Sequence, residues 1–307
     1  MFKEMTMKME YNNRIVLISD MHYTTQELPS ELKQIYPESK ASVAAGNTLG
    51  HTQKEKLDCI IDDVKAFTDK QNIDGILVLG DLSIDDYRFR NLPENYCQKF
   101  KEDCMSQFSQ PTYAIPGNHD SYPDDMWRDV FGYGRQYSFK LKDAAFIMLD
   151  TFNDCPAHTA SGSKYTGIDM EFLRAELKKY ESERIFICSH FFRVSEYPDE
   201  FIEILNTNPR IVCLFDAHTH KNRIFHDERI KQPKINIGGY GYQGEKREDG
   251  KWYFDRYDDA WAWGYEVLEW NDTVAHVYHV KPARRYVGCN GVFEHPYTIE
   301  NELTMYF

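Results

Sequence analysis

Short apolar runs that lead into a polar side chain recur along the chain. Each run is rich in Val, Ile, Leu or Phe, and each leads into Asp, Asn or His. The runs occupy residues 14–20, 75–81, 112–118, 184–190 and 210–218. Continuous apolar stretches of this length are typical of strands that are buried on both faces of a sheet.

Helical patterns separate these predicted strands. Residues 54–70 repeat apolar side chains at helical spacing, as at Leu57 and Val64, and residues 169–180 do the same. Alternation of strands and helices predicts a mostly parallel sheet with helices on its faces. Residues 251–280 instead alternate aromatic and polar side chains, which is typical of antiparallel strands.

Nothing in the sequence marks a boundary between two domains. We expect a single domain over residues 11–292, followed by a C-terminal tail over residues 293–307. Residues 24–50 have weak periodicity and contain Pro, Ser, Gly and Asn, which predicts an inserted loop at the mouth of the site. Such a loop is either a lid or a surface excursion without a role.

Composition narrows the class of protein. The chain has 307 residues, of which 42% are hydrophobic and 15% aromatic, so a large core is expected and disorder is excluded as the main description. Asp and Glu number 49 against 36 Lys and Arg, which gives a formal net charge of −13. A chain this acidic repels phosphate polymers, so we expect no duplex nucleic-acid partner. A small phosphorylated substrate remains compatible, because metal ions reverse the field inside a cleft.

The sequence indicates neither membrane insertion nor export. No stretch approaches the ~20 consecutive apolar residues of a membrane-spanning helix, and the N-terminus lacks the apolar segment of a signal peptide. The seven cysteines are scattered and form no Cys-x-x-Cys pair. This pattern argues against zinc ribbons and redox motifs and predicts a cytoplasmic protein without a membrane partner. The oligomeric state stays open.

The polar residues at the strand ends form a metal-ligand set. Ligands gather outside the carboxyl ends of parallel strands, so the five runs bring these residues to one rim. Carboxylate, imidazole and amide donors without a thiolate suit transition-metal ions such as Mn, Fe or Zn. Because eight residues exceed the needs of one ion, we expect two ions that share a carboxylate. The eight residues are Asp20, His22, Asp81, Asn118, His119, His190, His218 and His220.

Five short motifs contain these residues. In chain order they are Asp20-x-His22, Gly80-Asp81, Gly117-Asn118-His119-Asp120, Ser189-His190 and His218-x-His220. Each motif alone is weak, whereas all five in order, each after a predicted strand, are specific. Together they resemble the calcineurin-like metallophosphoesterase superfamily. The resemblance implies an α/β fold, namely a four-layer α/β/β/α sandwich of two mostly parallel or mixed sheets flanked by helices.

The resemblance also implies a role for each motif residue. Asp81 would bridge the two ions. Asp20, His22 and His220 would hold the first ion, and Asn118, His190 and His218 would hold the second. His119 is similar to the family's histidine that is not a ligand, and it would bind a phosphoryl oxygen or protonate the leaving group. His119 and Asp81 are therefore the predicted catalytic residues.

The implied activity is dinuclear metal-dependent hydrolysis of a small phosphodiester or phosphomonoester, carried by a nucleotide or a phosphorylated metabolite. Two ions lower the pKa of a bridging water, and the resulting hydroxide attacks phosphorus in line. The Gly-Asn-His-Asp form is similar to the cyclic-nucleotide phosphodiesterase branch, which favours diesters. The alternative from another class is a catalytically silent binding or scaffold protein with the same fold.

Three positions depart from patterns within the family. Ala217 stands where the family usually has Gly, and a backbone that requires positive φ would strain Ala and lead to a small local adjustment. Ile84 stands where purple acid phosphatases have Tyr and protein phosphatases have Asp. His119 differs from the Arg of lipid-A-precursor hydrolases. The candidates for orienting His119 are Asp85, Asp86 and Asp120.

The predicted substrate contacts are Asn118, His119, Arg193, Tyr240 and Tyr242. Tyr240 and Tyr242 have glycine neighbours, which indicates a loop near the rim, and their rings suit stacking on a nucleobase. Arg193 follows His190 closely and fits either a substrate phosphate or a surface position.

Overall fold

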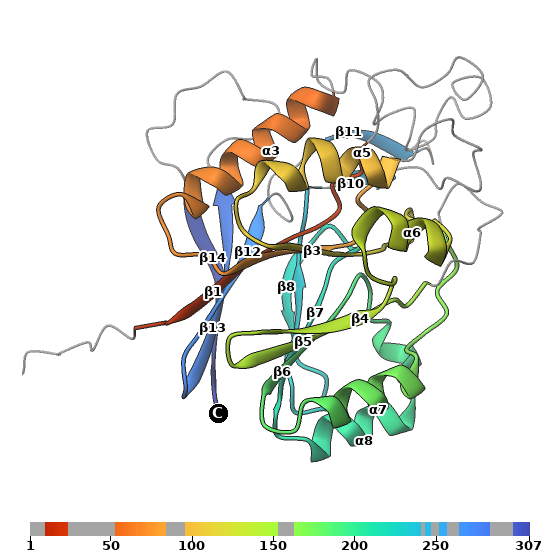
Figure 1. Cartoon of the computed structure of the whole chain (residues 1–307), viewed down its shortest axis with the longest axis vertical. Helices are drawn as coiled ribbons and strands as arrows, with labels where there is room; N and C mark the ends of the chain where they lie inside the picture. Colours follow the sequence, from red (N-terminus) through yellow and green to blue (C-terminus); the bar gives the residue numbers. More distant parts are fainter. Residues whose placement is uncertain are drawn as a thin grey trace, which may run out of the picture.

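Two six-stranded sheets and a two-stranded hairpin make up the β structure of the described chain (Figure 1). The computed structural model describes residues 10–23, 53–83, 96–152, 163–240, 243–246, 252–256, 264–282 and 297–307. The hairpin pairs β10 (Gln243–Lys246) with β11 (Trp252–Arg256) in antiparallel orientation. The loop predicted over residues 24–50 lies outside the described residues.

The first sheet has the strand order β14-β13-β12-β1-β2-β3. β1, β2 and β3 are parallel, and the other neighbouring pairs are antiparallel. The parallel strands therefore end at the same edge. The strands are β1 (Asn13–Ile18), β2 (Gly75–Leu79), β3 (Thr112–Ile115), β12 (Tyr265–Trp270), β13 (Val274–Pro282) and β14 (Tyr297–Tyr306).

The second sheet has the strand order β4-β5-β6-β7-β9-β8. Its four inner strands are parallel, and an antiparallel strand lies at each edge. The strands are β4 (Tyr137–Leu141), β5 (Ala144–Leu149), β6 (Arg184–Ser189), β7 (Ile211–Asp216), β8 (Asn222–Phe225) and β9 (Lys234–Ile237).

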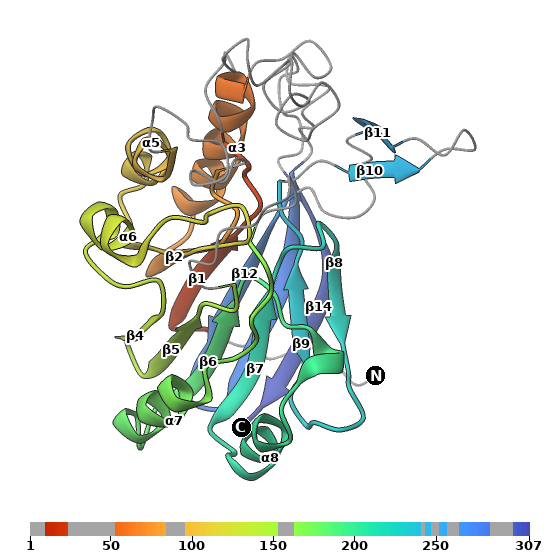
Figure 2. The same cartoon turned by 90° about the vertical axis from the view of Figure 1, so that its right-hand side faces the viewer.

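Helices lie on either side of the strands (Figures 1 and 2). On one side lie α3 (Gln53–Thr68), α5 (Tyr96–Asp103) and α6 (Asp124–Phe131), and on the other α7 (Met170–Lys179) and α8 (Asp199–Thr207). Two 3-10 turns span Met105–Gln107 and Val194–Glu196. The helices predicted over 54–70 and 169–180 are confirmed as α3 and α7. Among the described helices, none combines the length and the apolar character that crossing a membrane requires.

Three apolar clusters fill the spaces between the layers. The first joins α3, α5 and α6 to the first sheet and includes Val16 and Val64. The second lies between the two sheets and includes Leu17 and Phe146. The third joins α7 and α8 to the second sheet and includes Leu173. Neighbouring residues of β1 thus pack into different clusters, as expected for a strand that is buried on both faces. The molecule is a four-layer α/β/β/α sandwich, which confirms the predicted fold class.

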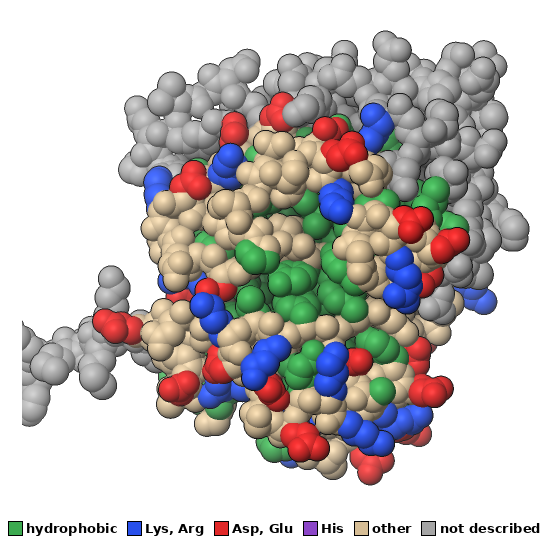
Figure 3. All heavy atoms as spheres, in the orientation of Figure 1, with side chains coloured by type: hydrophobic (Ala, Val, Ile, Leu, Met, Phe, Trp, Pro, Cys, Tyr) green, Lys and Arg blue, Asp and Glu red, His purple; other side chains and the backbone are tan. Residues whose placement is uncertain are grey.

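Aromatic side chains join the two sheets at the edge formed by β3 and β4. Tyr113 on β3 stacks on Phe139 on β4 with ring centroids 3.9 Å apart. The hydroxyl of Tyr137 donates to the carbonyl of Ala114 at 2.9 Å. Figure 3, which has the orientation of Figure 1, shows hydrophobic side chains gathered in the middle of the face toward the viewer.

The C-terminal segment differs from the predicted tail. Tyr297–Tyr306 forms the edge strand β14, which pairs with β13. Leu303 and Met305 pack against the cluster between the sheets, whereas Glu300 and Glu302 are exposed. Leu303 and Met305 alternate with the polar residues Glu302 and Thr304, which is a strand signal with a period of two.

Candidate metal centre

The loops that follow five parallel strands meet at one rim of the sandwich. Backbone hydrogen bonds join the loops that follow neighbouring strands of the same sheet. The N–H of Asp20 donates to the carbonyl of Gly80 at 3.1 Å, and the N–H of Ala217 donates to the carbonyl of His190 at 2.9 Å. The residues that follow the five strands at this rim include Asp20, Asp81, Asn118, His190 and His218.

Among the described residues, three groups of possible donor atoms overlap at this rim. Within each group the donor atoms lie within 4.8 Å of one another. Asp81 and His22 each belong to two groups, so the groups form one continuous cluster. They are Asp20, His22 and His220; His22, Asp81 and His119; and Asp81, His190 and His218.

Imidazole nitrogens face one another within the cluster. The Nε2 atoms of His22 and His220 are 3.1 Å apart. The Nε2 atom of His190 lies 3.3 Å from Nδ1 of His218 and 3.2 Å from Oδ1 of Asn118. Two lone pairs at such distances repel each other unless a proton or a cation lies between them. The arrangement therefore suits one cation beside each histidine pair.

Each of the two carboxylates uses one oxygen for anchoring and directs the other toward the cluster. Oδ2 of Asp20 accepts from the Ser19 hydroxyl at 2.7 Å. Its Oδ1 is buried without a hydrogen bond to the described residues and lies 3.2 Å from Nε2 of His220. Oδ1 of Asp81 accepts from the backbone N–H of His119 at 2.9 Å. Oδ2 of Asp81 lies 3.3 Å from Nε2 of His190 and 3.8 Å from Nε2 of His22.

The field of the buried carboxylates favours positive charge in the cluster. Burial opposes protonation of His190, but the carboxylate of Asp81 outweighs it and raises the pKa of His190 to about 10. Burial, together with the charge on His190, lowers the pKa of His218 to about 3. Nδ1 of His190 lies 2.7 Å from the carbonyl of Leu79, a contact that directs Nε2 toward the donors. Carboxylate, imidazole and amide donors in this arrangement fit two transition-metal ions.

Five of the candidate ligands adopt left-handed backbone conformations. These are Asp20, His22, Asp81, His218 and His220, with φ between 47° and 67°. This region costs a residue with a Cβ atom about 1–2 kcal/mol, although Asp, Asn and His enter it more often than other residues. Such strain is retained where the surrounding structure enforces it, and it gathers at functional sites.

Glycine is required where the loops pass closest to the donors. A Cβ atom on Gly80, which has φ 85°, would lie 2.6 Å from Nδ1 of His190. A Cβ atom on Gly117 would overlap the carboxylate of Asp81. Both glycines therefore let neighbouring loops approach closely enough to share one cluster.

Comparison with known proteins agrees with this geometry. The sequence profile of the calcineurin-like phosphoesterases matches residues 13–264. The chain belongs to the calcineurin-like phosphoesterase family. No curated protein matches the sequence of this family member.

Solved structures share the fold of this phosphoesterase family member. A dimetal phosphatase from Danio rerio superposes with a TM-score of 0.56 and 12% identity, covering 88% of this chain and 96% of its own. GAP50, described as the anchor in the inner membrane complex of Plasmodium, superposes with a TM-score of 0.53 and 15% identity, covering 95% and 90%. At these identities the likeness shows the fold alone.

Asp120 supports the loops of this family member and makes no hydrogen bond to the His119 ring among its described contacts. Its carboxylate accepts from the backbone N–H groups of Leu82, Ser83 and Gly117 at 2.8–3.1 Å. Burial and the nearby charge of Asp81 raise the pKa of Asp120 to about 6. Asp120 thus ties the loop after β2 to the loop after β3. The other candidates for orienting His119, Asp85 and Asp86, lie outside the described residues, as does Ile84.

Two further buried residues support the rim, and neither was predicted from the sequence. The side chain of Asn236 donates to the carbonyl of Ala217 at 2.6 Å and accepts from the Thr219 hydroxyl at 3.1 Å, so it binds the chain on both sides of His218. Arg135 donates to the carbonyl of Asp120 at 2.8 Å. Each binds the backbone of a distant loop, and no local sequence pattern reveals such a contact.

Ala217 does not carry the expected strain. The left-handed residue at this turn is His218, with φ 67°, and Ala217 is outside that region. Ala217 is fully buried and packs in the cluster between the sheets. An alanine is therefore accommodated here without a positive φ.

The predicted substrate contacts have different outcomes. Tyr240 is fully buried in the core beside α3, and burial raises the pKa of its hydroxyl well above the usual value. This burial contradicts a substrate contact. The prediction failed because glycine neighbours indicate a loop but not the direction of the side chain. Tyr242 lies outside the described residues. Asn118 and His119 lie in the cluster, and Arg193 is exposed and paired with Glu196 at 2.8 Å.

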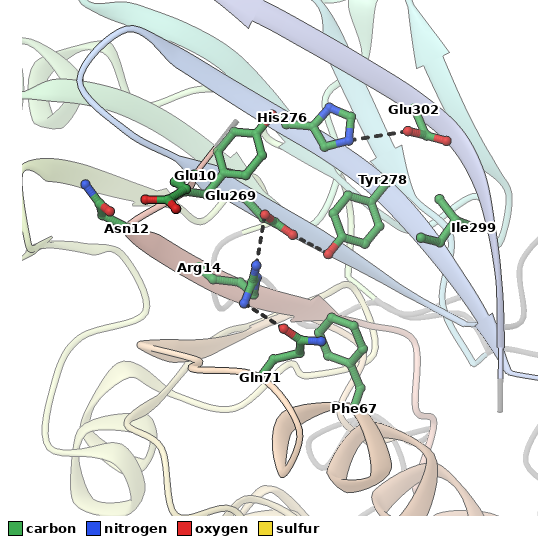
Figure 4. Close-up of a pocket in the computed structure, with 11 residues that line it drawn as sticks. Glu10, Asn12, Arg14, Phe67, Gln71, Glu269, His276, Tyr278, Ile299 and Glu302 are labelled. Atoms are coloured by element: carbon green, nitrogen blue, oxygen red, sulfur yellow. Dashed lines mark hydrogen bonds and ion pairs between the residues drawn. The ribbon is translucent and has the colours of Figure 1, made fainter. Parts of the chain in front are cut away.

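A cavity lies at the opposite end of β1 from the candidate metal centre. This cavity of about 780 Å³ is lined by residues of the first sheet and by Phe67 and Gln71 near the end of α3. Figure 4 shows Arg14 between Glu269 and Gln71, and both contacts measure 3.0 Å. His276 and Glu302, which also line this cavity, lie 3.4 Å apart, and none of the candidate ligands lines it.

Proposed function

We propose that the protein is a dinuclear metal-dependent phosphoesterase that hydrolyses a small phosphodiester or phosphomonoester, carried by a nucleotide or a phosphorylated metabolite. The observation that supports this function is the position of Asp81. Its Oδ2 atom faces His22 on one side and His190 on the other, so one carboxylate lies between two groups of donors. Membership of the calcineurin-like phosphoesterase family agrees with this assignment.

The candidate ligands divide between two ions, for which Mn, Fe and Zn fit the donor types. Asp81 would bridge the ions, with Asp20, His22 and His220 on the first and Asn118, His190 and His218 on the second. When bound, the pair would activate a water molecule and neutralise charge on the phosphoryl oxygens.

Two contacts of His119 support the role proposed for it. Its backbone N–H holds one oxygen of Asp81, which leaves the other oxygen for the cluster. Its ring lies edge-on to His22 with centroids 5.2 Å apart, beside the donors rather than outside them. From there the imidazole would bind a phosphoryl oxygen or donate a proton to the leaving group. The Gly-Asn-His-Asp form of this loop favours a diester as substrate.

Metal analysis and hydrolysis of two generic substrates test the proposal. Bis(p-nitrophenyl) phosphate represents diesters and p-nitrophenyl phosphate represents monoesters, each assayed with Mn²⁺, Zn²⁺ or Fe²⁺ added. We expect metal-stimulated release of nitrophenol by the wild type. Asp81→Asn should abolish turnover and lower the metal content, because Asn keeps the size of Asp but lacks its charge.

Asp74→Asn is the matched control. Asp74 precedes β2 at the end opposite Asp81, where it accepts from the backbone N–H of Arg14 at 2.9 Å. This variant should keep both metal and turnover. Bound metal without turnover of either ester would contradict the enzymatic proposal and favour the scaffold alternative. A wild type that binds no metal would contradict the metal centre itself.

A further inference from the structure

The candidate metal centre opens on the side of His218 and His220. Both are partly exposed, whereas His22, His119 and His190 are buried. A substrate that reaches the donors therefore approaches past His218 or His220. Side chains on this side are therefore placed to contact the organic group that is attached to the phosphate.

Phe191 places an aromatic ring at this opening. The ring is partly exposed and lies 4.5 Å from the ring of His218 between centroids, at an angle of 40°. Tyr165 supports it edge-on at 5.8 Å. A phenyl ring makes no strong interaction with phosphate oxygens, but a partly exposed ring suits a flat, apolar part of a substrate.

A guanidinium lies beside the same ring. Arg193 is 4.6 Å from the centroid of the Tyr165 ring and 5.9 Å from that of Phe191. Its ion pair with Glu196 joins two exposed side chains, and pairs of this kind are weak. A heteroaromatic ring stacked on Phe191 would therefore also lie next to a positive charge, which stabilises π systems.

Buried contacts hold this surface in place before any ligand binds. Phe152 is buried behind it, with its ring 5.8 Å from that of His190, 5.9 Å from that of His218 and 5.7 Å from that of Tyr165. The backbone N–H of Arg193 donates to the hydroxyl of Tyr165 at 3.3 Å. A preorganised platform loses little conformational entropy on binding.

We propose that Phe191, flanked by Tyr165 and Arg193, is the stacking platform for a nucleobase, and that the substrates are nucleoside phosphates. The inference rests on the proposed function, because it names the organic part of the ester that is hydrolysed at the metal centre. The aromatic contact with substrate would then come from Phe191 and not from Tyr240, which is buried in the core.

Direct binding measurements test the platform. Adenosine 5′-monophosphate and ribose 5-phosphate share the sugar and the phosphate and differ in the base, so calorimetric titration of each into protein supplied with Mn²⁺ isolates the base. Wild type should bind the adenosine compound about tenfold more tightly, as expected for one stacked base. Phe191→Leu keeps apolar volume against His218 but removes the aromatic face. It should lose this preference and retain its affinity for ribose 5-phosphate.

Two further variants complete the test. Phe191→Tyr keeps the ring and should keep the preference. Phe225→Leu replaces another exposed phenylalanine, on β8, and should also keep it. Equal binding of the two ligands by wild type would overturn the inference, as would a preference that persists in Phe191→Leu. Equal weakening of both ligands in that variant would show that the ring only supports His218, and would overturn the inference too. Absence of turnover contradicts the proposed function alone, because the platform is measured by binding.

Discussion

At the scale of single residues, the candidate donors follow from residue type and from position after a buried strand. His119 cannot be assigned in this way, because its residue type and its position beside Asn118 are those of a ligand. Its ring in fact lies in one group with His22 and Asp81. Asn236 could not be found from sequence. It donates to the backbone beside His218, which lies 18 residues earlier in the chain, and this hydrogen bond depends on the pairing of β7 with β9.

His119→Ala tests the role proposed for this residue. Loss of a general acid lowers turnover by about 10²–10⁴-fold, and we expect kcat for bis(p-nitrophenyl) phosphate to fall accordingly. Metal content should stay near that of the wild type, as measured by elemental analysis. His226→Ala, at an exposed position on the surface, serves as control and should leave both quantities unchanged. A variant that loses its metal would show that His119 is a ligand.

At the scale of elements, buried strands are the best-predicted features. Each of the five runs is a strand or leads out of one, because a strand buried on both faces needs an unbroken apolar stretch. The segment over residues 293–307 shows the opposite case. β14 lies at the edge of its sheet, and its exposed residues include Glu300 and Glu302 as well as Ile299 and Tyr306. The segment therefore lacks an unbroken apolar run and is easily taken for an irregular tail.

Leu303→Ala tests whether β14 belongs to the folded unit. Leu303 packs against the cluster between the sheets while remaining partly exposed, so its truncation should lower the free energy of unfolding by about 1–2 kcal/mol. Urea denaturation followed by circular dichroism measures the change. Glu302→Ala, at the neighbouring exposed position, is the control and should have little effect. Equal midpoints for Leu303→Ala and wild type would mean that this strand contributes nothing to stability.

At the scale of the whole molecule, the candidate centre links the two sheets. Asp20 and Asp81 come from the first sheet, and His190 and His218 come from the second. Ions held between these residues would bind the folded chain and not the unfolded one. Stability should therefore depend on metal concentration. This coupling follows from sheet packing, which the strand-end pattern alone did not specify.

Thermal unfolding tests the link between metal and stability. Addition of Mn²⁺ to chelator-treated protein should raise the melting temperature progressively, with about 2.7 kcal/mol gained at a hundredfold excess over the dissociation constant. Asp81→Asn should show a much flatter response, because it lacks the charge shared by both groups. A melting temperature that does not respond to Mn²⁺, Zn²⁺ or Fe²⁺ would contradict ligation across the sheets.

The left-handed turns at five donors restrict how this centre can change over evolutionary time. At these positions a residue must tolerate an unfavourable backbone and also offer a lone pair, and Asp, Asn and His meet both demands best. Exchange for Cys or Glu would supply a different donor on a backbone that disfavours it. Substitution at these positions is therefore largely limited to these three residue types. Adaptation to a softer metal would require the turns themselves to be rebuilt.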